Sequence, residues 1–192
     1  MIGQQFDVKR ELEERGALLH GHFRLSSGRH SAQFIQKFRV LEIPSVVERI
    51  ATALIAKLGD QRQTTVVLSA AVGGIILGYE VGRQLGVRAI FVEKEGGAPA
   101  LRRGFELSGA DRALVVEDVI TTGGSVREVL DVARERGAQI AAVGAIVRRE
   151  PVDFGVPTVA LVDVPIPSFA PEECPLCKAG EPFTEPGSRF LR

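Results

Sequence analysis

Apolar and polar residues alternate in blocks along most of the chain after residue 64. Short apolar runs, rich in β-branched residues, predict buried strands at residues 65–68, 89–92, 113–116, 140–147 and 159–162. Two of the intervening segments, residues 75–85 and 125–136, predict helices, the second ending at Gly137. Strands that alternate with helices indicate an α/β fold, a parallel sheet flanked by helices on both faces.

The first 60 residues follow a different pattern. Residues 6–15 predict a short amphipathic helix, and residues 22–38 predict two extended pieces around a Ser-Gly turn, as a hairpin or hood. A long helix is expected to begin at Pro44. We therefore expect a single domain over residues 1–192, with an N-terminal hood (1–45), a core sheet (60–165) and an irregular Pro- and Gly-rich tail (165–192).

Composition narrows the class of protein. The chain has 192 residues, 45% of them hydrophobic, which is enough for one domain with a sizeable core. Its formal net charge is zero, so nothing in the overall charge calls for a nucleic-acid partner. We find no apolar run long enough to cross a bilayer and no signal peptide at the N-terminus, so we expect a cytoplasmic protein without a membrane partner.

The strongest chemical signal is the segment from Leu114 to Ser125, which reads LVVEDVITTGGS. An apolar strand ends in Glu117 and Asp118, which would be costly to bury unless they are used. The Thr-Thr-Gly-Gly-Ser turn that follows offers hydroxyls and backbone N–H groups, and the next helix would add its positive dipole end. A ribose 5-phosphate suits this arrangement, with its phosphate in the turn and its hydroxyls on the two acids.

Two further loops carry residues suited to phosphate chemistry. The small residues of Ser69–Gly74 would let the backbone approach an anion closely, although a plain strand-to-helix turn remains an alternative. Residues 93–104 combine Gly and Pro with the cations Lys94, Arg102 and Arg103, which is typical of a mobile flap. The alternative is a solvated hairpin whose charges only maintain solubility. Beyond a later strand, Arg149 could bind a carboxylate or an imide edge, or could pair with Glu150 instead.

The 114–125 segment resembles the phosphoribosyl-diphosphate (PRPP) signature of the type I phosphoribosyltransferases. The resemblance implies that PRPP contacts the signature residues Glu117, Asp118, Val119, Ile120, Thr121, Thr122, Gly123, Gly124 and Ser125. It also implies that Ala71, Val72 and Gly73 contact the diphosphate, that Lys94, Asp118 and Glu117 are catalytic, and that Mg²⁺ is bound mainly by PRPP. A homodimer with shared active sites is implied as well.

Within that family the chain is similar to the orotate phosphoribosyltransferases. Residues 23–31, FRLSSGRHS, resemble their N-terminal Phe-x-Leu-x-Ser-Gly-x-x-Ser motif. The positions of Phe34, Thr121 and Arg149 match residues that contact orotate in those enzymes. The resemblance implies transfer of ribose 5-phosphate from PRPP to orotate, giving orotidine 5-monophosphate and diphosphate in pyrimidine synthesis. Two alternatives stay open: a transferase for a purine base, and a regulator that senses PRPP.

The chain departs from the family pattern at several positions. Ser26 and Gly73 occupy places where the family commonly has lysines, one in the hood and one in the diphosphate loop. After Lys94 the flap has no further Lys or His, and Arg102 and Arg103 are assigned to PRPP by their charge alone. These departures suggest a divergent branch with less certain base specificity.

The only two cysteines of the sequence form a Cys-x-x-Cys motif at Cys174 and Cys177. Two thiols supply half of a typical structural zinc site, and the three histidines lie at the opposite end of the sequence. A buried turn, half of a metal site completed by a second subunit, and a redox pair are all compatible with the motif. Of these three interpretations, a buried turn with no metal or redox role is the one we expect first.

Overall fold

The computed structural model describes residues 6–25 and 27–186. Its centre is a six-stranded sheet in the order β5-β4-β3-β6-β7-β8, in which only the edge strand β5 runs antiparallel. The strands are β3 (Val66–Ala70), β4 (Arg88–Glu95), β5 (Ala98–Leu101), β6 (Arg112–Ile120), β7 (Gln139–Arg148) and β8 (Thr158–Asp163).

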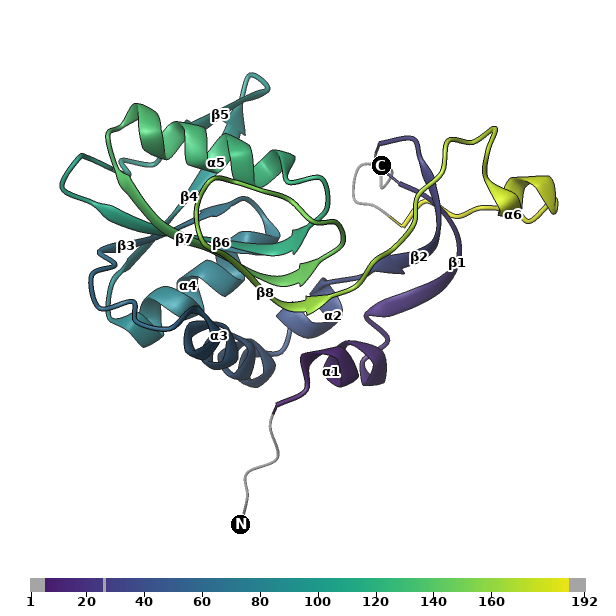
Figure 1. The fold of residues 1–192 in the computed structure, drawn as a ribbon, viewed down its shortest axis with the longest axis horizontal. Helices are drawn as coiled ribbons and strands as arrows, with labels where there is room; N and C mark the ends of the chain where they lie inside the picture. The colour runs from purple at the N-terminus through teal and green to yellow at the C-terminus, as the bar shows by residue number, and fades with distance from the viewer. Residues whose placement is uncertain (1–5, 26, 187–192) are drawn as a thin grey trace, which may run out of the picture.

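Helices cover both faces of this sheet, as Figure 1 shows. Helices α3 (Pro44–Leu58) and α4 (Gly73–Leu85) pack on one face, and α5 (Gly124–Glu135) packs on the other. Two short helices, α1 (Val8–Glu14) and α2 (Phe38–Leu41), lie beside α3 and α4, and a single turn, α6 (Pro175–Lys178), lies in the C-terminal segment.

The alternation of side chains along each strand divides the apolar core into two layers. Val67, Leu114 and Ile146 pack with α3 and α4, while Val66 and Val115 pack with α5. All five side chains are almost fully buried, so both faces of the sheet exclude water. The predicted fold class, a parallel sheet with helices on both faces, is confirmed.

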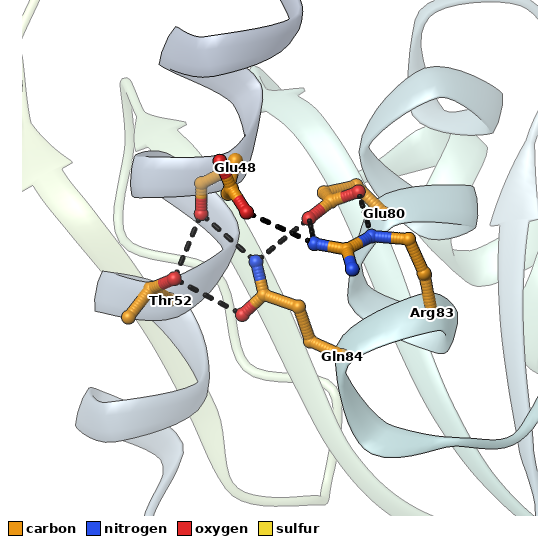
Figure 2. A network of polar contacts seen from close by, with 5 residues as sticks. All are labelled: Glu48, Thr52, Glu80, Arg83 and Gln84. Atoms are coloured by element: carbon orange, nitrogen blue, oxygen red, sulfur yellow. Dashed lines mark hydrogen bonds and ion pairs between the residues drawn. The ribbon is translucent and has the colours of Figure 1, made fainter.

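A polar network fixes α3 against α4, the helix that begins at the candidate diphosphate loop. Arg83 donates to Glu80 and to Glu48 on α3, at 2.8 and 3.1 Å from their carboxylate oxygens (Figure 2). Gln84 donates to the Glu48 carbonyl and accepts from the Thr52 hydroxyl. The Arg83 and Glu48 side chains are 53% and 59% exposed, so the ion pair between the helices orients them more than it stabilises the fold.

The N-terminal hairpin stands apart from the main sheet. Strands β1 (Leu18–Arg24) and β2 (His30–Ile35) pair antiparallel, and the C-terminal segment runs alongside them (Figure 1). Two isolated bridges join the pieces, Phe23 to Thr184 and His30 to Phe169. A hood is therefore present, but the domain boundaries drawn from the sequence remain a prediction, and Ser26 lies outside the described residues.

Several element boundaries differ from those predicted. Strand β6 continues to Ile120 because β7 pairs with it as far as Arg148, so the two acids lie within the strand and not at its end. Residues 95–104, expected as a loop, contain the turn and the second strand of the β4–β5 hairpin, which is closed by Gly96 and Gly97 at φ +59° and +90°. A Gly-Gly pair between extended segments is a hairpin signal, and a hairpin was the alternative to the mobile flap.

Candidate functional site

Glu117 and Asp118 form the polar centre of the sheet. Their exposures are only 6% and 1%, and both carboxylates reach the first turn of α4. Each acid has a local backbone partner: Glu117 Oε1 accepts from Asp118 N at 2.9 Å, and Asp118 Oδ1 accepts from Val119 N at 2.6 Å. A buried acid pair beside a helix N-terminus has both the position and the electrostatic support to bind sugar hydroxyls.

Lys37 completes this centre, and the sequence analysis missed it. Its Nζ lies 2.6 Å from Asp118 Oδ2, and its side chain is 33% exposed. Gly73 makes the approach possible, since a Cβ at that position would lie 1.7 Å from Asp118 Oδ2 and 2.9 Å from Lys37 Cε. A lysine just before α2 carries no sequence signal for a partner that lies on β6. We call Glu117, Asp118 and Lys37 the acid–lysine cluster.

The protonation of Glu117 follows from its surroundings. Burial, together with the neighbouring charge of Asp118, raises the pKa of the Glu117 carboxyl to about 8, and Lys37 opposes that rise. At neutral pH the free protein therefore holds Glu117 mostly as the neutral acid. It can then donate a hydrogen bond as well as accept one, which suits a hydroxyl ligand.

The turn after β6 leads directly into α5, as predicted. Thr121 and Thr122 are exposed, and Gly123 caps the helix at φ +80°, where no side chain caps the first N–H groups. A Cβ on Gly123 would lie 2.8–2.9 Å from atoms of Arg127 and Phe154, so glycine is required there. The open N-terminus of a 12-residue helix is a fitting place for a phosphate.

The loop after β3 lies on the other side of the acids. Ala71 N donates to the Val92 carbonyl at 2.9 Å, the Ala71–Val72 peptide is cis, and Val72 is 69% exposed. Gly73 then begins α4, two residues before the predicted start. The N-termini of α4 and α5 thus both adjoin the strand that carries the acids, so an anion between them would meet two positive dipole ends.

The flap cations already have carboxylate partners. Lys94 pairs with Glu128 on α5, Arg102 Nε lies 3.2 Å from Glu95 Oε1, and Arg103 donates to Glu93 at 3.0 Å. The side chains of the three cations are 54%, 47% and 60% exposed to solvent. The structure therefore keeps them on and beside the hairpin, where the sequence placed them, and does not bring them into contact with the acid–lysine cluster.

Arg149 lies just beyond β7, and only part of its guanidinium group is hydrogen-bonded within the described residues. Its Nη2 donates to the Ile166 carbonyl at 2.9 Å, while its buried Nε has no hydrogen-bond partner among the described residues. Burial lowers the pKa of Arg149 below its ordinary value, and Glu150 opposes this. Phe34, another of the three predicted base contacts, packs against Phe23 in the hood, with ring centroids 5.9 Å apart. Among the described residues, no interaction joins Phe34 to Arg149.

The structure brings the Cys-x-x-Cys motif together with two histidines. His22 and His30, remote in sequence, lie directly against Cys174 and Cys177, because the C-terminal segment folds back on the hairpin. His20, on the same strand as His22, is exposed and outside this group. We call His22, His30, Cys174 and Cys177 the Cys–His cluster.

The comparisons with known proteins agree with this geometry. Residues 39–153 match the family model described as the phosphoribosyl transferase domain. The chain therefore belongs to the phosphoribosyltransferase family. Among the described helices, none combines the length and apolar character needed to cross a membrane.

Particular relatives narrow the family. The orotate phosphoribosyltransferase of Heliobacterium modesticaldum is 51% identical over 189 residues, which are 97% of this chain and 97% of that protein. That of Thermotoga petrophila is 46% identical over 187 residues, 96% of this chain and 100% of that protein. The crystal structure of orotate phosphoribosyltransferase from Aeropyrum pernix matches with a TM-score of 0.71 at 27% identity, over 82% of this chain and 93% of that one. Within its family, the chain groups with the orotate phosphoribosyltransferases, so the predicted resemblance is confirmed.

Proposed function

We propose that the chain transfers ribose 5-phosphate from PRPP to orotate, releasing diphosphate and forming orotidine 5-monophosphate in pyrimidine synthesis. The observation that carries the proposal is the buried acid pair of β6, set between the open N-termini of α4 and α5. The names of relatives that are 46–51% identical over nearly the whole chain supply the base. They do not favour the purine or sensor alternatives.

The proposed site divides PRPP among three parts of the chain. The turn from Thr121 to Ser125 and the start of α5 bind the 5-phosphate, and Val119 and Ile120 bring the strand to that turn. Glu117 and Asp118 bind the ribose hydroxyls. The backbone of Ala71, Val72 and Gly73, at the start of α4, binds the diphosphate.

Displacement at the anomeric carbon of ribose requires no protein nucleophile. By analogy with glycosyl transfer, the transition state resembles an oxocarbenium ion, which the negative charge of Asp118 stabilises. Lys94, Arg102 and Arg103 would leave their carboxylate partners and approach the departing diphosphate when the hairpin closes. Arg149 would donate its free Nε–H to the base, and Phe34 would pack against the ring.

We infer that Mg²⁺ accompanies PRPP, as the family resemblance implies. Mg²⁺ prefers oxygen ligands and keeps several waters, so diphosphate and ribose oxygens can supply most of its shell. The residues present fit a metal carried by the substrate, because Asp118 is already paired with Lys37 and Glu117 is mostly neutral at pH 7. When bound, the ion would neutralise charge on the leaving diphosphate.

We also propose a homodimer. Val72, Ile76 and Tyr79 follow one another at helical spacing along the start of α4, and they are 69%, 37% and 69% exposed. An apolar stripe of this kind next to the diphosphate loop is a fitting subunit interface. Sedimentation at assay concentrations should give a dimer, and an active monomer would contradict this proposal. The cytoplasmic location remains a prediction.

A base panel tests the function. The enzyme, PRPP and Mg²⁺ are incubated with orotate, uracil, adenine, hypoxanthine or xanthine, and diphosphate release is followed. We expect product with orotate alone. Release with a purine but not with orotate would overturn the assignment of the base, and PRPP binding without release on any base would favour a sensor.

A further inference from the structure

The Cys–His cluster is a second buried polar site, separate from the acid–lysine cluster and unused by the transferase reaction. Its four potential ligand atoms all lie within 4.8 Å of one another. His22, His30 and Cys174 are 5%, 3% and 0% exposed, and both cysteines are free thiols. Two imidazole nitrogens and two sulfurs that meet in a closed space form a complete set of four ligands for one metal ion.

Four of the six spacings between these atoms are close to those of a tetrahedral site. His22 Nε2 lies 2.9 Å from His30 Nδ1, 3.5 Å from Cys174 Sγ and 3.6 Å from Cys177 Sγ, and His30 Nδ1 lies 3.1 Å from Cys177 Sγ. Zinc bonds of about 2.0–2.1 Å to nitrogen and about 2.3 Å to sulfur put tetrahedral ligands about 3.3–3.8 Å apart. The four distances lie within about 0.5 Å of those values, and all pairs of ligand atoms lie within 4.8 Å, so side-chain shifts of an ångström or less would admit an ion.

The orientation of His22 is fixed from outside the cluster. Its Nδ1 lies 2.8 Å from the Glu181 carbonyl oxygen, which can only accept a hydrogen bond. The proton of the neutral ring is therefore on Nδ1, and the lone pair of Nε2 points toward the two sulfurs. A ligand imidazole whose second nitrogen donates to a carbonyl is the usual support of a zinc-binding histidine.

The backbone around the cysteines has the form of a metal-binding turn. Cys174 directly precedes the single turn α6, and Cys177 lies inside it, so two residues separate the cysteines along the chain. Lys178 N donates to the Cys174 carbonyl, Gly180 N donates to the Cys177 carbonyl, and Gly180 has a φ of +72°. A short Cys-x-x-Cys turn with a glycine just after it presents both thiols on the same side.

From these observations we propose that His22, His30, Cys174 and Cys177 bind one structural Zn²⁺ ion per chain. The ion joins β1 and β2 of the hood to the C-terminal segment. The same segment accepts hydrogen bonds from the hood at two more points, Ser31 to the Pro167 carbonyl and Arg29 to Ser168. No second subunit is needed, because all four ligands come from one chain. With no open ligand position, the site is structural and not catalytic.

Metal content is the first test. The full-length chain is purified without a polyhistidine tag, and zinc is measured by mass spectrometry. We expect about one zinc per chain in the wild type and less than about 0.2 in Cys174→Ser, Cys177→Ser and His22→Ala. His20→Ala is the matched control, because His20 is exposed on the same strand, and it should keep the wild-type content.

A second measurement guards against variants that fail to fold. The wild-type protein is stripped with a chelator, then titrated with Zn²⁺ or with Co²⁺. We expect saturation at one equivalent, a cobalt spectrum with thiolate charge transfer and tetrahedral bands, and a rise in Tm of at least about 5 °C, as ligand saturation gives a chain of this size. The proposal is overturned if the wild type neither contains zinc nor takes it up, if Cys174→Ser or Cys177→Ser retains the wild-type zinc content, or if a Cys174–Cys177 disulfide forms in its place.

Discussion

The two buried polar clusters of this protein are built in opposite ways. In the acid–lysine cluster, the acids are neighbours in sequence, and only Lys37 comes from another element. In the Cys–His cluster, the contacts between histidines and cysteines join residues 147 to 155 positions apart. The first cluster lies near the C-terminal end of the central strand β6, while the second lies between the hood and the C-terminal segment. In both clusters, buried polar side chains indicate a functional or binding site. Only a cluster whose residues are close in sequence can be recognised as a motif before the structure is known.

The comparison predicts that damage to the first cluster removes activity and leaves the fold, whereas damage to the second loosens the hood. Gly73→Ala should have the largest effect. Its Cβ would overlap Asp118 Oδ2 and crowd Lys37, so the acid must move from its position. We expect kcat/KM to fall at least about 100-fold, about 2.7 kcal/mol of barrier, with zinc content unchanged.

Gly109→Ala is the control for that change, because its Cβ would meet no atom closer than 3.6 Å. It should retain nearly full activity. Wild-type kcat/KM in Gly73→Ala would show that the tight contact with Asp118 is not needed for the reaction.

Asp118→Asn should have the next largest effect on activity. The amide keeps the shape of the side chain but removes the negative charge that faces Lys37 and, by our proposal, the ribose. We expect turnover to fall at least about tenfold, about 1.4 kcal/mol, without a change in the circular dichroism spectrum. Asp131→Asn, an exposed acid on α5, should match the wild type, and equal turnover in both variants would argue against the ribose role.

How much of each cluster the sequence predicts follows from these distances along the chain. The acids, the Thr121–Ser125 turn and the helix after it lie within one short segment, so apolar pattern and turn chemistry suffice to place them. Lys37 could not be found, because its partner is set by how α2 packs beside the sheet. For the Cys–His cluster, half of a metal site was one interpretation of the cysteines, but the two histidines were missed for the same reason, since folding back of the C-terminal segment is a tertiary event.

The ends of the helices and strands show the same difference between what local sequence predicts and what tertiary packing decides. The centre of each strand and helix in the main sheet follows from local apolar periodicity, as with α5 or β7. The ends of β6 and the β4–β5 hairpin do not, because they depend on which neighbours pair with them. Local sequence patterns therefore predict the scaffold of the proposed PRPP site better than the hood that would cover the base.

Glu117→Gln tests how the buried carboxyl of the acid–lysine cluster changes the stability of the fold with pH. The carboxyl holds its proton up to a pKa of about 8 in the folded protein but releases it near 4.5 when unfolded. Between these values the unfolded chain binds fewer protons, so this group makes the fold less stable as pH rises. Glutamine stays neutral over this range. The free energy of unfolding of the variant minus that of the wild type should therefore increase by about 1.4 kcal/mol or more from about pH 5 to about pH 8.

Urea denaturation at the two pH values measures that gain. Glu106→Gln, at an exposed position, is the control and should show no such trend. A parallel pH dependence for wild type and Glu117→Gln would mean that the buried carboxyl is ionised across the whole range.

The smallest expected effect comes from a local contact outside both clusters. Asp7 caps α1 by accepting from Arg10 N at 3.1 Å, and α1 packs beside the start of the hood. Asp7→Ala should lower the free energy of unfolding by about 1 kcal/mol, without changing zinc content or KM for orotate. Asp7→Asn should restore most of that loss, because asparagine caps a helix equally well. Equal losses in the two variants, measured by urea denaturation, would indicate that the charge of Asp7, and not its cap, supports the helix.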